Sequence, residues 1–510
     1  MHELEQLIGL FVAAVALAAL ARRVGAPYPV FLAIGGAGLA LLPIQSTFSL
    51  PPELALALFV APVLLDAAFD SSLRDLRDNW LPVTGLVVFA VGLTTLAVAA
   101  VVRALVPEMP WAAAIALGAV VAPPDAVSAS AVLRPLRPPH RILTVLEGES
   151  LLNDATALLI LRLAITAVAA DGVTFGDVAP TFLLGVVGSL VAGPAMGWVT
   201  LWLLDRVRHV PTAIILQFVT TFSVWMIAER VGLSGVLTMV SYTIMVARVS
   251  PGRTPARVRI PTYAVWETVV FALNILAFIF IGLQLRPIVG SLSPNVRGQY
   301  VAVAAAVLVT VIVVRLTWQL SVSAVTQWWH RRFGFTPPRP MLRPSFKSAL
   351  IVAWAGMRGI VSLAAALALP AAFPHRDLVV LTAFAVVLGT LVIHGLTLGP
   401  LLRCFDLRDG DPVGREVRTA RDRTLAAALA TLDGDQSDSA MSVRRELAAH
   451  LGGDENDGPD ADGESARHHD LHARATHAAR QVLLTMRADE EIGDDAFHRV
   501  EEQLDWLDMR

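Results

Sequence analysis

The sequence predicts an all-α polytopic membrane protein with a small tail, and three observations support that fold class. Of the 510 residues, 55% are hydrophobic and only 16% are charged, whereas about a quarter of an ordinary soluble domain is charged. The mean hydropathy is +0.62, and the apolar residues form long runs, which excludes a typical soluble enzyme. Residues 1–404 carry 27 basic and 18 acidic side chains, and residues 405–510 carry 13 and 25. We therefore expect a basic transmembrane domain over 1–404 and an acidic domain over 405–510.

Thirteen apolar stretches are long enough, at about 20 residues each, to cross the hydrocarbon core of a bilayer. The first six and the last six are predicted to form two inverted six-helix repeats, with the seventh stretch as a linker. The stretches lie near 5–21, 28–44, 53–70, 80–104, 111–133, 142–169, 178–204, 211–229, 233–247, 264–285, 300–327, 346–370 and 377–402.

The loops between these stretches predict the orientation of the chain. Cytoplasmic loops of membrane proteins carry an excess of Lys and Arg. With Lys347 and Arg103, which lie at the ends of stretches beside these loops, the loops after odd-numbered stretches hold 18 basic residues and the loops after even-numbered stretches hold 5. We therefore expect the N-terminus outside and the tail in the cytoplasm.

The tail has helical periods near 415–432 and 470–488, separated by an acidic, glycine-rich linker, and is predicted to be partly helical and partly disordered. Its histidine cluster is interpreted as a solvated helix face rather than a metal site, because no thiolate lies nearby. The single cysteine cannot form a disulfide within the chain. The cluster consists of His468, His469, His472 and His477, and the cysteine is Cys404.

Two of the apolar stretches are predicted to break in the middle. Consecutive prolines in Ala122-Pro123-Pro124-Asp125 remove two N–H donors, and Gly356-Met357-Arg358-Gly359 interrupts the twelfth stretch. Broken helices at matching places in two halves of a chain indicate a transporter site; the alternative is a pair of simple kinks or close-packing positions. Asp125 lies where the positive ends of half-helices meet, so we expect it to compensate their dipoles.

Charged side chains inside hydrocarbon are costly and functional by default. Ser150 and Asp154 are four residues apart and share one face of the helix predicted over 142–169, and Glu149 and Asn153 form a parallel pair. This oxygen-rich set suits a hard monovalent cation; the alternative is a polar clamp between helices. Further charges within the apolar stretches are Asp66, Glu147, Arg162, Glu267, Arg315 and Arg358.

Arg358 lies at the second break and needs a partner for its charge. A buried guanidinium without a carboxylate is prohibitive, so we predict an ion pair between Arg358 and Glu149. Asp154 then remains the carboxylate that is most free to titrate.

In combination, these residues resemble the sodium/proton exchanger family, the electroneutral branch of the cation:proton antiporters. The resemblance covers essentially all of residues 1–404, and the acidic tail is similar to that of bacterial members. It rests on Glu149-Ser150-Leu151-Leu152-Asn153-Asp154-Ala155, Pro124-Asp125, Trp354-Ala355-Gly356-Met357-Arg358-Gly359, Trp266-Glu267, Phe280-Ile281-Gly282-Leu283-Gln284-Leu285 and Gly395-Leu396-Thr397-Leu398.

The resemblance implies a set of binding residues. Asp154 would bind the cation and the proton in turn, with Ser150 as a side-chain ligand and the backbone carbonyl near Pro124 as another. Asp66 stands where the family usually has Glu, so its contact with the ion is expected to run through water. The metal ligands for Na⁺ would be Asp154 and Ser150.

The resemblance also implies that Glu149 and Arg358 form a stabilising pair, with Asn153 hydrogen-bonded nearby. The function it implies is exchange of Na⁺ or Li⁺ for H⁺, one for one and without net charge movement, by a homodimer in a bacterial cytoplasmic membrane. We expect no enzymatic activity, cofactor or nucleic-acid partner. A K⁺/H⁺ antiporter with the same site, a cation channel and an ion sensor coupled to the tail remain alternatives.

Overall fold

The computed structural model describes residues 2–42, 51–70, 83–136, 138–169, 175–253, 256–334, 345–405 and 407. The chain divides into two compact units, Met1–Asp409 and Gly410–Arg510. The second unit holds most of the predicted tail, with the cluster of four histidines, and lies outside the described residues. The helices below all belong to the first unit.

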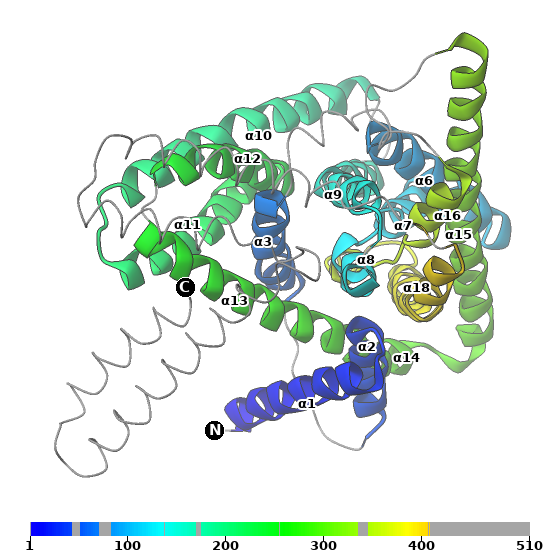
Figure 1. Ribbon diagram of the computed structural model, residues 1–510. Helices are drawn as coiled ribbons and strands as arrows, with labels where there is room; N and C mark the ends of the chain where they lie inside the picture. The colour runs from blue at the N-terminus through cyan, green and yellow to red at the C-terminus, as the bar shows by residue number, and fades with distance from the viewer. Residues whose placement is uncertain are drawn as a thin grey trace, which may run out of the picture. The chain divides into compact units, whose positions relative to one another are not determined.

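The described residues are almost entirely helical, and each of the thirteen predicted stretches coincides largely with one helix or two consecutive ones. The elements, labelled in part in Figure 1, are α1 (His2–Val24), α2 (Tyr28–Leu41), α3 (Pro52–Asp70), η1 (Gly85–Ala90), α6 (Val91–Leu105), α7 (Trp111–Val121), α8 (Ala126–Leu133), η2 (Arg134–Leu136), α9 (His140–Ala169), α10 (Phe175–Leu204), α11 (Val210–Arg230), α12 (Gly235–Arg253), α13 (Ala256–Leu283), α14 (Leu285–Ser291), α15 (Pro294–Phe333), α16 (Phe346–Trp354), α17 (Ile360–Leu367) and α18 (Arg376–Phe405).

Within the described part of the chain, eight helical segments are long and apolar enough to cross a membrane. Three shorter apolar helices, Tyr28–Leu41, Leu54–Asp66 and Gly235–Ser250, fall on other predicted stretches. Large apolar side chains such as Leu184 and Val191 of α10 are exposed, as expected of a surface that meets lipid. The fold is that of a polytopic helical membrane protein; the count of thirteen crossings and the inverted repeats stay predictions.

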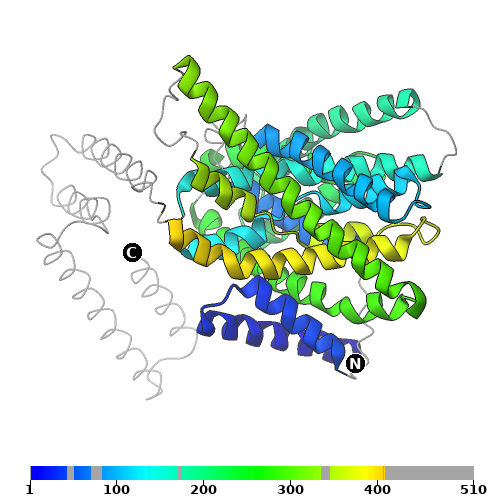
Figure 2. The same cartoon turned by 90° about the vertical axis from the view of Figure 1, so that its right-hand side faces the viewer.

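The helices form two groups that meet at the centre of the unit (Figure 1). In one group, α10, α11 and α12 pack together and against α3, and α13 packs on α1 and α2. In the other, α6 and α9 flank α7, while α15 packs on α16 and α18. Figure 2 shows α15 and α18 crossing along the side of this second group. The site lies where the groups meet.

A close crossing with α2 fixes the rotation of α13. A Cβ atom on Gly36 would lie 2.3 Å from the carbonyl oxygen of Ile279, and one on Gly282 would lie 2.1 Å from that of Ala33. Only glycine permits backbones to approach this closely. The crossing therefore determines which face α13 turns toward its other neighbours.

Both predicted breaks are confirmed. Short non-helical segments separate α7 from α8 and α16 from α17, and most of their residues are buried. The two segments are joined, because the N–H of Asp125 donates to the carbonyl oxygen of Met357 at 2.7 Å. The breaks place free helix ends inside the protein, where their unpaired N–H and C=O groups need partners.

Candidate cation-binding site

A cavity brings together several side chains that the sequence singles out for ion binding. Asp154 and Ser150 line it from α9, Asp66 lines it from α3, and Asp125 lines it from the segment before α8. Most of the other lining residues are apolar side chains of α3, α13 and α17. An ion in this cavity would find carboxylate and hydroxyl oxygens, the ligands that hard cations prefer, against an apolar background.

Asp154 is a buried carboxylate of this cavity without a partner among the described residues. Its exposed fraction is 7%, and no described residue forms a hydrogen bond or an ion pair with it. Ser150 lies one turn earlier on the same face of α9. Because an unpaired charge away from water is unfavourable, a bound proton or cation would stabilise this side chain.

Asp125 lies at the N-terminal ends of two half-helices. It is the N-cap residue of α8, and its carboxylate accepts hydrogen bonds from the N–H of Val127, at 3.0 Å, and from the hydroxyl of Ser128. Gly359, the N-cap of α17, packs against the same carboxylate: a Cβ there would lie 2.2 Å from Oδ2. A negative charge at this point offsets both helix dipoles, and Asp125 lies at the break where the sequence predicts it.

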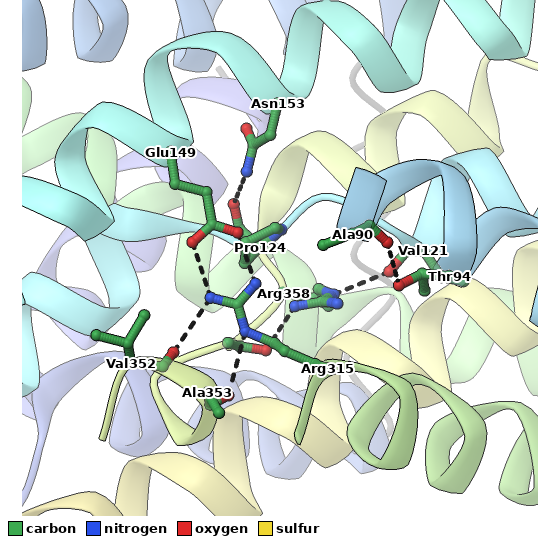
Figure 3. A network of polar contacts seen from close by, with 11 residues as sticks. Ala90, Thr94, Val121, Pro124, Glu149, Asn153, Arg315, Val352, Ala353 and Arg358 are labelled. Carbon is green, nitrogen blue, oxygen red and sulfur yellow. Dashed lines mark hydrogen bonds and ion pairs between the residues drawn. The ribbon is translucent and has the colours of Figure 1, made fainter. Parts of the chain in front are cut away.

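Glu149 pairs with Arg315 of α15 and not with Arg358, so the predicted partner is wrong. Nη1 of Arg315 lies 2.6 Å from Oε1 of Glu149, and Nη2 lies 2.8 Å from Oε2 (Figure 3). Both side chains are buried, with exposed fractions of 4% and 1%, and bidentate pairs of this kind are strong. Arg315 also donates to the carbonyl oxygens of Val352 and Ala353, in the last turn of α16.

Arg358 is held by backbone carbonyl groups instead of a carboxylate. Its Nε donates to the carbonyl oxygen of Val121 at 2.8 Å, and its Nη1 donates to that of Gly356 at 2.7 Å (Figure 3). Val121 is the last residue of α7, where carbonyls without helical partners carry partial negative charge. The broken helix thus supplies the acceptors that the buried guanidinium requires, and this is why the predicted pair with Glu149 does not form.

Asn153 supports the site from behind the cavity. Its Nδ2 donates to the carbonyl oxygen of Pro124 at 3.0 Å (Figure 3), and the side chain is fully buried. The Pro124 carbonyl, predicted as an ion ligand, therefore already accepts a hydrogen bond, and Pro124 is not among the residues that line the cavity. Any contact with an ion would have to use its second lone pair.

Two features of the cavity were not among the predicted site residues. Arg134 and Glu147 both line it, and Nη2 of Arg134 lies 3.1 Å from Oε1 of Glu147. Asn274 of α13 also lines it. The sequence does mark Asn274, because it is an amide in the middle of the apolar stretch 264–285. Arg315 gave a similar signal, as the only charged residue of 300–327.

The fold and the site together define a class of protein: a polytopic helical membrane protein in which two broken helices, joined at their breaks, lie beside a cavity lined by polar side chains, as in secondary transporters. The chain belongs to the sodium/hydrogen exchanger family. The family described as "Sodium/hydrogen exchanger, transmembrane" matches residues 10–404.

Similar proteins are found in several bacteria. An uncharacterized Na⁺/H⁺ exchanger of Mycobacterium tuberculosis is 30% identical over 461 residues, which cover 87% of this chain and 82% of the relative. A sodium, potassium, lithium and rubidium/H⁺ antiporter of Bacillus subtilis is 27% identical over 429 residues, which cover 81% of this chain and 63% of the relative. The low-affinity Na⁺/H⁺ antiporter NhaS1 of Synechocystis is 27% identical over 461 residues, which cover 87% of this chain and 83% of the relative.

The fold is similar to that of a solved structure. The sodium proton antiporter MjNhaP1 from Methanocaldococcus jannaschii at pH 8 matches with a TM-score of 0.59 and 15% sequence identity. The match covers 79% of this chain and 99% of that chain.

Proposed function

We propose that the chain exchanges Na⁺ or Li⁺ for H⁺ across the membrane by alternating access, with Asp154 as the shared binding carboxylate. The observation that carries the proposal is that Asp154 has no partner among the described residues, in a cavity lined by Ser150 and Asp66. Competition between cation and proton for one carboxylate couples the two fluxes. Crossing between the inward-open and outward-open states is favourable only when the carboxylate is occupied, because an empty charged site is costly to enclose.

The proposal includes exchange of one cation for one proton, and two of the other charges near the site support it. Glu149 is balanced by Arg315, and Asp125 is balanced by the hydrogen bonds and dipoles at the ends of α8 and α17. We take Asp154 as the carboxylate that changes its occupancy during the cycle, so no net charge moves. In this proposal, Ser150 and Asp154 are the cation ligands and Asp66 contributes directly or through a water molecule.

Transport of K⁺ is the second candidate. A relative that is 27% identical to this chain is named a sodium, potassium, lithium and rubidium/H⁺ antiporter, and the same oxygen set can hold a larger ion if the cavity is wider. We further propose that the protein lies in a bacterial cytoplasmic membrane as a homodimer, with its N-terminus outside and its tail in the cytoplasm.

A flux measurement on everted membrane vesicles tests the proposal. A pH-sensitive dye reports proton movement when Li⁺, Na⁺ and K⁺ are added in turn. We expect dequenching with the wild-type chain and none with Asp154→Asn, because an amide cannot exchange a proton for a cation. Cation-driven proton flux in Asp154→Asn would contradict the proposal. A steady current through the protein would indicate a channel instead.

A further inference from the structure

One polar side chain that lines the cavity, Asn274, has no role in the proposed exchange of cation and proton. Four residues of α13 line the cavity at helical spacing, and three of them, Val270, Ala277 and Phe278, are apolar. The fourth is Asn274. No described residue forms a hydrogen bond with its side-chain amide.

The position of Asn274 is fixed by the packing of α13. The Gly36 and Gly282 crossing sets the rotation of the helix against α2. On the same side, the ring of Tyr28 packs edge-on against Phe271 and Phe278, with ring centroids 5.9 and 6.0 Å apart. The helix therefore cannot turn the amide away from the cavity without losing this packing.

We propose that Asn274 is a further ligand of the transported cation, through its side-chain oxygen, and that it favours the smaller cations. The inference rests on the proposed function. An amide in an apolar wall is costly unless it is paired with water or an ion, and amide oxygens are accepted ligands of hard cations. Because the amide is neutral, it adds an oxygen without changing the charge balance of the exchange.

The ligand would also come from the opposite group of helices. Asn274 stands on α13, which packs with α1, α2 and α3, whereas Asp154 and Ser150 stand on α9. A cation bound to all three would connect the two groups. Asn153, on α9, donates its amide nitrogen to the carbonyl oxygen of Pro124 and does not line the cavity. Asn274 is the amide that lines the cavity among the described residues.

The test compares purified wild-type protein with Asn274→Ala and Asn274→Asp in proteoliposomes. The measured quantities are the apparent KM for Li⁺, Na⁺ and K⁺ and the maximal rate, read from a pH-sensitive dye. Loss of an oxygen that bonds a charged ligand is expected to raise the KM for Li⁺ and Na⁺ about tenfold in Asn274→Ala, with a smaller change for K⁺ and the same maximal rate. Asn274→Asp keeps an oxygen at this place, so its KM for Na⁺ should be no higher than that of the wild type.

Thr268→Ala is the matched control. Thr268 lies on the same helix, is exposed, and among the described residues bonds only to the carbonyl oxygen of Ala264, so its loss should change none of the KM values. Equal KM values in Asn274→Ala and the wild type overturn the inference, and so does an increase by the same factor for all three cations. If Asn274→Ala does not fold, an Asn274→Asp variant with a raised KM for Na⁺ overturns it. A wild-type chain that exchanges no cation would instead refute the proposed function.

Discussion

Both terminal nitrogens of Arg315 bond to the two carboxylate oxygens of Glu149, and the same guanidinium bonds to the last carbonyls of α16. One side chain of α15 therefore ties α9 to the end of a broken helix. Arg358 likewise donates to the carbonyl oxygen of Val121, the last residue of α7. The two arginines therefore donate to free carbonyl groups at the C-terminal ends of half-helices, and Asp125 lies against the N-terminal ends.

The first prediction concerns the ion pair between Arg315 and Glu149. Removing one partner of a buried ion pair leaves the other charge unpaired, so Arg315→Gln should lower the free energy of unfolding by about 3–5 kcal/mol. Glu149→Gln in the same chain should restore much of that loss, because it removes the orphaned charge. Thermal unfolding of the purified variants in detergent measures both effects.

Arg358→Gln provides the control for this rescue. Its guanidinium bonds to carbonyl oxygens of Val121 and Gly356, so Glu149→Gln should not restore its stability. Equal rescue of the Arg315 and Arg358 variants would contradict the assignment of the pair.

The same two arginines show what sequence reasoning can reach. Both are visible as charges in apolar stretches, and Glu149 is visible as a buried carboxylate. Which arginine meets the carboxylate depends on how three distant segments pack, which no local pattern encodes. The prediction counted only carboxylates as partners and omitted the free carbonyls that the predicted breaks would create.

Features that depend on local chemistry were predicted well. The break at Pro123-Pro124 follows from two missing N–H donors, and the shared face of Ser150 and Asp154 follows from helical spacing. The position of Asn274, by contrast, does not follow from local sequence. It depends on the rotation of α13, which is fixed by the crossing at Gly36 and Gly282, two residues that are 246 positions apart in the sequence.

A second prediction concerns the shape of the Arg358 side chain. Lys keeps the positive charge, but one ammonium group cannot reproduce a planar fork that reaches two carbonyls. Arg358→Lys should therefore lose about 1–3 kcal/mol of stability, and the maximal exchange rate should fall as the break loosens. Arg376→Lys is the matched control, because Arg376 also bonds two carbonyls, those of Leu367 and Leu369, but does not line the cavity. A normal exchange rate in Arg358→Lys would argue against its role at the break.

A third prediction concerns the contact between Asp125 and Gly359. A methyl group at Gly359 would lie 2.2 Å from Oδ2 of Asp125, so Gly359→Ala must displace the carboxylate or the start of α17. We expect the exchange rate to fall by more than about tenfold, since even small displacements of a site are costly. Gly298→Ala on α15 has open space around its new Cβ and should leave the rate unchanged. Equal rates in both variants would refute the predicted clash.

The last prediction concerns motion of α9. Nη2 of Arg162 bonds to Oε2 of Glu229, and Nη1 donates to the carbonyl oxygen of Leu233 at 3.1 Å. The other carboxylate oxygen of Glu229 accepts from the N–H of Gly235 at 3.0 Å. These bonds join the later half of α9, the helix that carries Asp154, to the turn between α11 and α12. Partly exposed pairs of this kind are weak, so the contact can open and close during each cycle.

If alternating access moves α9 relative to α11 and α12, a covalent bond at this contact must stop it. In a Cys404→Ser background, we expect a short bifunctional thiol reagent to join Arg162→Cys to Glu229→Cys and to abolish cation-driven proton flux in vesicles. A cleavable reagent should allow a reductant to restore the flux, and each single-cysteine variant should be insensitive to the reagent. Full flux in a completely cross-linked sample would mean that this end of α9 does not separate from the turn, and the moving boundary would then have to lie elsewhere in the fold.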